Sequence, residues 1–315
     1  MILQCKDVLG LEDMSAEEIL GVLDIANRFR AVFDRPVRSV PIMRGRTVVN
    51  FFHEPSTRTR ISFELAEKRL SADIINFVSS ESSFKKGETL RDTAENLAAM
   101  KIDMLIVRHS SAGAARYLAD VLECSVINAG DGPHEHPTQG LLDIMTMHQR
   151  LGDMRGKKVT IIGDITHSRV ARSNIWGLTK LGAEVTLCGP PTMVPGGLDK
   201  LGCRIEFDLA KAVRDADVLN VLRIQLERHS SRAFPSNREY HRMFGISPDV
   251  VRSLKPGAFI MHPGPMNRDV EISSEVADGP NQVILDQVAN GVAVRMALIY
   301  LLSGGDPGAL GSGSN

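Results

Sequence analysis

Short apolar runs alternate with helical patterns along most of this 315-residue chain, and this alternation constrains the fold more than any other feature. Such alternation is typical of right-handed βαβ units, which build a parallel sheet with helices on both faces. A helix is also expected after Ser15, which forms a capping box with Glu18. In the first half of the chain, the expected strands are 47–52, 73–78, 103–107 and 125–128, and the expected helices are 58–70, 88–100, 112–122 and 137–150.

A second alternating series follows the polar, glycine-containing segment 151–158, which we interpret as a linker. A chain of this length is too long for one ordinary core and suits two domains. The sequence therefore predicts an α/β protein with two doubly wound parallel-sheet domains, 1–150 and 151–286, and a last helix at about 287–302 that could pack on either domain. The expected strands of the second domain are 158–162, 184–188, 203–207, 217–221, 258–262 and 282–285.

Composition excludes several classes of function. A net charge of -1 argues against a general nucleic-acid or membrane surface. The four cysteines, Cys5, Cys124, Cys188 and Cys203, are far apart in sequence, which predicts buried thiols in a reducing compartment. The chain has no signal-peptide pattern and no apolar run that approaches a membrane span, so we expect a cytoplasmic protein.

The pentad Ser56-Thr57-Arg58-Thr59-Arg60 lies where the first expected strand ends and a helix begins. Free backbone N–H groups and the helix dipole favour an anion at such a point. Guanidinium groups match phosphate oxygens two at a time, and the two threonines add hydroxyl donors. The pentad therefore predicts a phosphate site without the lysine of a P-loop. The alternative is an ordinary N-cap serine followed by solvated arginines.

Further polar clusters follow other expected strands. Ligands of open parallel sheets bind beyond the carboxyl ends of the strands, so these clusters should converge. Together they predict a cleft between the domains for two anionic molecules. The clusters are Arg108-His109, His136-Pro137-Thr138-Gln139, Gly163-Asp164 through Arg169, Arg223-Ile224-Gln225 and His262-Pro263-Gly264-Pro265.

Each cluster also has a simpler interpretation. Arg108 and Arg169 could be ordinary surface charges. His262 could have a purely structural role as the residue that caps a strand. His134-Glu135-His136 could bind a metal, but no third ligand has suitable spacing. Gly163-Asp164 could belong to a dinucleotide loop, but the G-x-G-x-x-G pattern is absent.

Five motifs occur in an order that resembles the aspartate transcarbamoylase catalytic chains of the aspartate/ornithine transcarbamoylase family. They are S-T-R-T-R, K-K-G-E-T-L-R-D-T, H-P-T-Q-G-L-L-D, R-x-Q-x-E-R and H-P-G-P-M-N-R, and they span nearly the whole chain. Asp269 stands where we expect glycine in many relatives. The resemblance implies transfer of the carbamoyl group of carbamoyl phosphate to L-aspartate, as in pyrimidine biosynthesis, with no metal and no cofactor.

The resemblance also implies roles for individual residues on the carbamoyl phosphate side. Ser56, Thr57, Arg58 and Thr59 would hold the phosphate. The carbonyl oxygen would be contacted by Thr59, Arg108 and His136, and the amino group by Gln139.

On the aspartate side, the resemblance implies that Arg169, Arg223 and Gln225 hold the two carboxylates, with backbone contacts from Pro263 and Gly264. The residues implied to orient those arginines are Glu54, Glu227 and Arg228. The loop 79–87 carries Ser82 and Lys86 and would reach into a neighbouring subunit's site, with Lys86 contacting both substrates. This implies a homotrimer with shared active sites, although such a loop could equally be an idle surface.

Three other functions share features with this sequence. Ornithine transcarbamoylases share the pentad and H-P-T-Q, but an H-C-L-P loop is expected in place of His262–Pro265, and Arg223 would repel ornithine's cationic side chain. A noncatalytic assembly partner would be expected to lack Arg58, Arg108 or His136, which are all present. A dinucleotide-dependent oxidoreductase lacks its glycine fingerprint. Whether a regulatory chain or a dihydroorotase partner binds stays open.

Overall fold

The computed structural model describes residues 2–78, 89–225, 234–306 and 308. The chain divides into two compact units, which are described separately. Unit 1 comprises Met1–Leu142 and Ala289–Asn315, and unit 2 comprises Asp143–Val288. The division falls within two helices, α5 (Pro137–Leu151) and α11 (Ile284–Leu302), whereas the sequence predicted it after residue 150.

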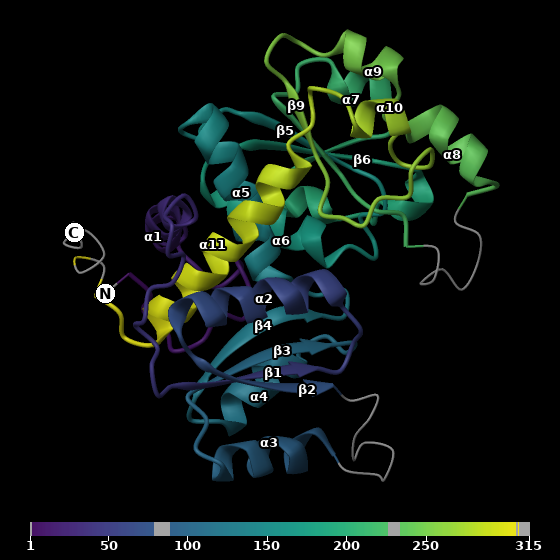
Figure 1. Cartoon of the computed structure of the whole chain (residues 1–315). Helices are drawn as coiled ribbons and strands as arrows, with labels where there is room; N and C mark the ends of the chain where they lie inside the picture. Colours follow the sequence, from purple (N-terminus) through teal and green to yellow (C-terminus); the bar gives the residue numbers. More distant parts are fainter. Residues whose placement is uncertain (1, 79–88, 226–233, 307, 309–315) are drawn as a thin grey trace. The chain divides into compact units, whose positions relative to one another are not determined.

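Unit 1 is built on a four-stranded parallel sheet with the order β2-β1-β3-β4. Helix α2 covers one face of this sheet, and α3 and α4 cover the other (Figure 1). Buried apolar side chains of the strands pack against α3 and α4 to form the core on that side. The elements are α1 (Ala16–Val32), β1 (Thr47–Phe52), α2 (Thr57–Leu70), β2 (Asp73–Val78), α3 (Leu90–Ala99), β3 (Met104–His109), α4 (Ala114–Val121) and β4 (Ser125–Asp131).

Unit 2 contains a five-stranded parallel sheet with the order β7-β6-β5-β8-β9. Two parallel sheets, one in each unit, make this the α/β fold that the sequence predicted. The strands are β5 (Lys158–Ile162), β6 (Glu184–Cys188), β7 (Arg204–Glu206), β8 (Val218–Val221) and β9 (Phe259–Met261). The helices are α6 (Arg169–Lys180), α7 (Leu209–Val213), α8 (Asn237–Phe244), α9 (Pro248–Ser253) and α10 (Ser274–Ala277), with short 3-10 turns η3 (Pro191–Met193) and η4 (Leu198–Leu201).

One expected strand, 282–285, is wrong. Gln282 makes only an isolated bridge to Ile260, and α11 begins at Ile284. The side-chain oxygen of Gln282 accepts a hydrogen bond from the Ile284 N–H over 2.8 Å, which satisfies a donor at the helix start.

The predicted capping box of α1 is confirmed, because Ser15 and Glu18 satisfy each other's backbone N–H groups.

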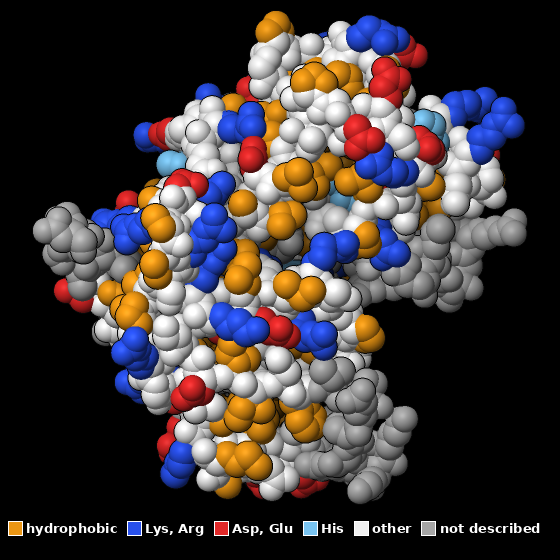
Figure 2. All heavy atoms as spheres, in the orientation of Figure 1, with side chains coloured by type: hydrophobic (Ala, Val, Ile, Leu, Met, Phe, Trp, Pro, Cys, Tyr) orange, Lys and Arg blue, Asp and Glu red, His pale blue; other side chains and the backbone are white. Residues whose placement is uncertain are grey.

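Helix α11 is apolar and long enough to cross a membrane by composition alone, but 72% of that window is buried. It is therefore a core helix of a soluble protein. On the visible face in Figure 2, among the residues drawn in colour, Lys and Arg side chains are interspersed with Asp and Glu. This mixed surface agrees with the net charge of -1.

The cysteines are free thiols in different environments. Cys188 and Cys203 are buried, Cys124 is half-buried, and Cys5 is exposed. The prediction of four buried thiols is therefore wrong for Cys5, which lies near the N-terminus with its Sγ against the Asp7 carbonyl. Burial raises the pKa of the Cys188 thiol to about 12, so that thiol stays protonated at neutral pH.

Candidate functional site

The amino end of α2 presents hydrogen-bond donors, and its first turn contains no acidic residue. Ser56 occupies the N-cap position with extended backbone, but among the described residues its hydroxyl accepts no capping hydrogen bond. The first turn contains Thr57, Arg58, Thr59 and Arg60 and carries no acidic residue. The helix dipole and the first-turn N–H groups therefore favour an anion here. Ser56 is therefore the N-cap residue of α2 by position, but within the described part of the chain it does not make the side-chain hydrogen bond of an ordinary cap.

Arg108 lies at the carboxyl end of β3, next to the end of β1. Its guanidinium donates to Glu54 over 2.7 Å and to the carbonyl of Ala129 over 3.1 Å. The side chains of Arg108 and Glu54 are 11% and 18% exposed, so this is not an ordinary surface charge. The backbone N–H of His53 donates to the Arg108 carbonyl, which fixes the segment between β1 and α2 against β3.

His109 follows Arg108 and stacks on His53, with ring centroids 4.4 Å apart. Burial lowers the pKa of His109, and its electrostatic interaction with the neighbouring His53 lowers it further. The imidazole of His109 is consequently neutral at neutral pH. The cationic character of this sheet edge therefore comes from arginines and not from His109.

His136 immediately precedes α5 and is 4% exposed. Its carbonyl accepts hydrogen bonds from the N–H groups of Gln139 and Gly140, which begin the helix. The preceding turn is fixed by Glu135, whose buried carboxylate accepts from the backbone of Leu11 and Glu12. His136 and Gln139 thus open a second helix in unit 1, beyond β4.

Sequence reasoning missed Arg295, which belongs to the part of α11 in unit 1. This arginine is 3% exposed and donates to Ser62 of α2 over 3.0 Å and to Thr138 of α5 over 3.2 Å. It therefore connects the two helices that begin at the pentad and at His136. The available signal was a single arginine within the otherwise apolar run 292–302.

In unit 2, Arg169 begins α6 and is 6% exposed, so it too is not a surface charge. Ser168 caps the helix by accepting from the Ala171 N–H. The preceding turn is fixed by Asp164, which contacts the backbone N–H and Nδ1 of His167. Gly163 has φ +129°, and a Cβ there would lie 3.2 Å from the Leu222 carbonyl oxygen, so this turn requires glycine.

The other predicted residues of unit 2 lie after β8, which is next to β5 in the sheet, and after β9, which is next to β8. Gln225 donates to the His167 carbonyl over 3.3 Å, which ties the loop after β8 to the loop after β5. Asn267 donates to the Ile224 carbonyl over 3.0 Å, which ties the loop after β9 to the loop after β8. Arg169 therefore follows the loop after β5, and the other predicted residues of unit 2 lie in loops that are hydrogen-bonded to it in series.

Glu12, His134 and Glu135 have potential ligand atoms within 4.8 Å of one another. Glu12 is a third candidate ligand that the sequence did not suggest. However, the Glu135 carboxylate accepts from two backbone N–H groups, and His134 Nδ1 lies 3.1 Å from Asp131. Hydrogen bonding to Asp131 raises the pKa of His134. We therefore interpret this cluster as a turn-forming network.

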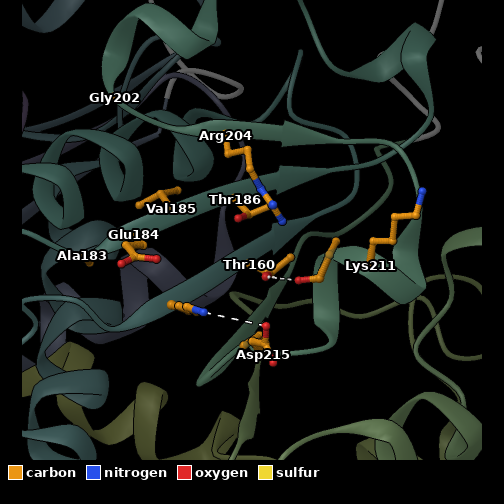
Figure 3. Close-up of a pocket in the computed structure, with 12 residues that line it drawn as sticks. Thr160, Ala183, Glu184, Val185, Thr186, Gly202, Arg204, Lys211 and Asp215 are labelled. Carbon is orange, nitrogen blue, oxygen red and sulfur yellow. Dashed lines mark hydrogen bonds and ion pairs between the residues drawn. The ribbon is translucent and has the colours of Figure 1, made fainter.

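A polar hollow of about 370 Å³ lies at the amino-terminal half of β5 and β6 in unit 2. Figure 3 shows Thr160, which donates to the Ala212 carbonyl over 2.8 Å, and Asp215, which is 3.8 Å from Lys158. The hollow contains none of the predicted site residues and lies at the opposite strand ends. It is lined by Lys158, Thr160, Ala183, Glu184, Val185, Thr186, Gly202, Arg204, Lys211, Ala212, Asp215 and Ala216.

Four predicted residues lie outside the described residues: Ser82, Lys86, Glu227 and Arg228. The predicted residues within the described ranges fall into two groups. Those of unit 1 lie after β1, at the end of β3 and at the start of α5. Those of unit 2 lie at the start of α6, which follows β5, and in the loops after β8 and β9.

Comparison with known protein families gives two matches. Residues 6–149 match the carbamoyl-P binding domain of aspartate/ornithine carbamoyltransferase. Residues 155–302 match the Asp/Orn binding domain of the same family. Together these two matches cover most of the chain.

Individual relatives agree with this assignment. The aspartate carbamoyltransferase catalytic subunit of Gemmatimonas aurantiaca is 58% identical over 302 residues, which cover 96% of this chain and 95% of that protein. That of Syntrophotalea carbinolica is 58% identical over 96% of both proteins. Among solved structures, aspartate transcarbamoylase from Trypanosoma cruzi, in complex with N-(phosphonacetyl)-L-aspartic acid, matches with a TM-score of 0.84 at 29% identity, over 93% of this chain and 94% of that one. Ornithine carbamoyltransferase from Pyrococcus furiosus matches with a TM-score of 0.84 at 30% identity, over 95% and 97%.

Proposed function

Since this chain belongs to the aspartate/ornithine carbamoyltransferase family, we propose how its two groups of residues carry out carbamoyl transfer. The activity is that of an aspartate carbamoyltransferase: the carbamoyl group of carbamoyl phosphate passes to L-aspartate, giving N-carbamoyl-L-aspartate and phosphate. Relatives that carry this name are 54–58% identical over nearly the full chain. The reaction belongs to pyrimidine synthesis.

The observation that best supports the carbamoyl phosphate site is the uncapped amino end of α2. The proposed phosphate ligands are Ser56, Thr57, Arg58 and Thr59. The first turn holds no acidic residue, and the helix dipole and the Arg58 charge both favour an anion at this end of the helix. Phosphate leaves as an anion, so the same charges also favour its departure.

We assign polarisation of the carbonyl group to Thr59, Arg108 and His136, and a contact with the carbamoyl amino group to Gln139. Negative charge gathers on the carbonyl oxygen when the aspartate amine attacks the carbonyl carbon. The C–N bond forms as the C–O bond to phosphate breaks, and the proton that the amine loses departs with the phosphate products. Donors fixed around such an oxygen contribute roughly 3 kcal/mol each in comparable sites. The Glu54 contact supports this role by holding Arg108 in place.

Aspartate recognition is assigned to unit 2. Arg169, Arg223 and Gln225 would hold the two carboxylates, and Pro263 and Gly264 would contribute backbone contacts. Hydrogen bonds between the loops that carry these residues support the assignment. Arginine forks suit carboxylates and would repel the cationic side chain of ornithine.

We also propose a cytoplasmic homotrimer in which Ser82 and Lys86 of one subunit complete the site of the next. Glu227 and Arg228 would orient the aspartate-binding arginines. A head-to-tail interface that closes on itself forms a ring, so that each subunit both donates and receives one loop. Regulatory and dihydroorotase chains are candidate partners, which co-purification with each of them would test.

Product identification tests the substrate assignment. Purified protein is incubated with carbamoyl phosphate and either L-aspartate or L-ornithine, and the products are identified by mass spectrometry. We expect N-carbamoyl-L-aspartate with aspartate and little citrulline with ornithine. Equal or faster formation of citrulline would contradict the proposed aspartate pocket.

A further inference from the structure

We propose that Glu271 is a positioning residue for aspartate, because its buried carboxylate holds together the loops after β8 and β9. This inference rests on the proposed function of those loops. Neither Glu271 nor its partner Asn267 is among the residues assigned to substrate. Glu271 lies in the segment between β9 and α10 and is 0% exposed.

The first contact of Glu271 fixes the loop that contains Pro263 and Gly264. The backbone N–H of Gly264 can only donate, so His262 Nδ1 accepts its hydrogen bond, which is 2.8 Å long. The ring proton of His262 is therefore on Nε2, where it is donated to Glu271 Oε1 over 3.2 Å. The imidazole thus transmits the position of the Glu271 carboxylate directly to the backbone of Gly264.

The second contact fixes the loop that contains Arg223 and Gln225. The backbone N–H of Asn267 donates to Glu271 Oε1, and its side-chain amide donates to Glu271 Oε2 over 3.3 Å. The same amide donates to the carbonyl of Ile224 over 3.0 Å. Ile224 stands between Arg223 and Gln225, so Asn267 carries the constraint from Glu271 to the proposed carboxylate ligands.

His262 has an independent anchor on its other side. Its backbone N–H donates to Gln287 over 2.9 Å, and Gln287 donates to the buried carboxylate of Asp143 over 2.8 Å. Asp143 also accepts from Asn174 of α6 over 2.8 Å. This anchor does not involve Glu271, so His262 should stay in place when the carboxylate is replaced.

Burial of a carboxylate is costly unless hydrogen bonds compensate, and an apolar side chain usually packs at lower cost. Among the residues that the structure describes, the Glu271 carboxylate accepts three hydrogen bonds from two residues, His262 and Asn267, which both lie in the loop after β9. If Glu271 only stabilised the fold, its contacts with the loop after β9 would be sufficient. However, the Asn267 amide also donates a hydrogen bond to the Ile224 carbonyl, in the loop after β8. This second contact is the reason for assigning Glu271 a role in aligning the two proposed substrate-binding loops.

The test compares three variants of the full-length enzyme. Asn267→Ala removes the link to Ile224 and leaves the His262–Glu271 contact intact. Glu271→Gln keeps the shape of the side chain and removes its charge. Arg268→Ala is the matched control, since Arg268 lies in the same loop and pairs with exposed Asp278. Steady-state kinetics are measured with each substrate varied, and circular dichroism checks folding.

We expect Asn267→Ala and Glu271→Gln to raise the KM for aspartate by about tenfold or more, which is the loss expected for a charge-assisted hydrogen bond. The KM for carbamoyl phosphate should stay within about twofold, as should all constants of Arg268→Ala. If folded Asn267→Ala leaves the aspartate KM unchanged, or raises both KM values equally, the inference is overturned. A wild-type enzyme that does not carbamoylate aspartate would instead refute the proposed function.

Discussion

The guanidinium of Arg108 and the carboxylate of Glu54 form a hydrogen-bonded ion pair with a 2.7 Å contact between Nη2 and Oε1. Both side chains are largely buried, so solvent screens this pair less than a surface pair. A second guanidinium nitrogen donates to the Ala129 carbonyl. Arg108 is therefore held from two directions at the sheet edge where the carbamoyl group is proposed to bind.

Glu54→Gln should lower kcat by about tenfold, because Arg108 would lose its charged partner and its fixed orientation. Steady-state kinetics at saturating concentrations of both substrates measure this effect. Asp103→Asn is a matched control, since Asp103 pairs with Arg46 over 2.7 Å just before β3, at the other end of the same sheet. Equal losses of kcat in both variants would contradict a specific role for Glu54.

Arg58→Ala and Arg223→Ala should affect different substrates. Arg58 lies at the amino end of α2, so its loss should weaken carbamoyl phosphate binding. Arg223 follows β8 and is a proposed ligand of an aspartate carboxylate, so its loss should raise the KM for aspartate. Each lost charge contact should cost about 2–5 kcal/mol if the bound site is desolvated. If both variants changed the KM for carbamoyl phosphate and the KM for aspartate to the same extent, the separate roles of Arg58 and Arg223 would be refuted.

We expect Glu67 to make the stability of unit 1 depend on pH. Burial raises its pKa from 4.5 to about 8, although the hydrogen bond from Asn50 opposes this. Below pH 4.5 the folded and unfolded states both carry the proton, and the contribution to stability is fully present. Between pH 4.5 and 8 only the folded state retains the proton, so the free energy of unfolding falls as pH rises through this window.

Glu67→Gln should remove this part of the pH dependence, because the amide does not ionise. Urea midpoints at pH 5.5 and 8.5 should therefore differ less for Glu67→Gln than for the wild type. The control is Glu95→Gln on α3, where the carboxylate is exposed and pairs with Arg91. A Glu67→Gln variant with the wild-type pH dependence would show that Glu67 ionises normally in the folded state.

The shared site in a trimer can be tested by mixing two inactive variants, Arg58→Ala and Lys86→Ala. The two proteins are unfolded together and allowed to reassemble. Any mixed cyclic trimer contains one site that pairs intact Arg58 with intact Lys86 of the neighbour, so about one third of normal activity per mixed trimer is expected. A reassembled mixture no more active than either parent would show that Lys86 does not serve the adjacent subunit.

Most of the α/β architecture could be predicted from sequence, because buried parallel strands are continuous apolar runs. The bounds of 47–52, 73–78, 158–162 and 184–188 agree with β1, β2, β5 and β6. The expected strand 282–285 failed because Val283, Ile284 and Leu285 suit a strand and a helix start equally well by apolarity. The hydrogen bond from the Ile284 N–H to Gln282 decides between them.

The site residues at strand ends could be proposed from sequence, because topology places the carboxyl ends of parallel strands along one edge. The residues that hold them could not. Arg295 is separated by more than 150 residues from both Ser62 and Thr138, and no local pattern links them. Asn267 likewise contacts Ile224 through a fold-dependent approach of two loops.

The hydrogen bonds of Glu271 also set the size of the part that can be exchanged between enzymes of this family. Grafting a loop that lacks His262 and Asn267 in place of 262–268 alone would leave the buried Glu271 carboxylate without these two side-chain donors. Grafting 223–225 alone would leave the Asn267 amide facing a foreign backbone. We therefore expect a change of amino-acid substrate by loop transplantation to succeed only when both loops and residue 271 are moved together.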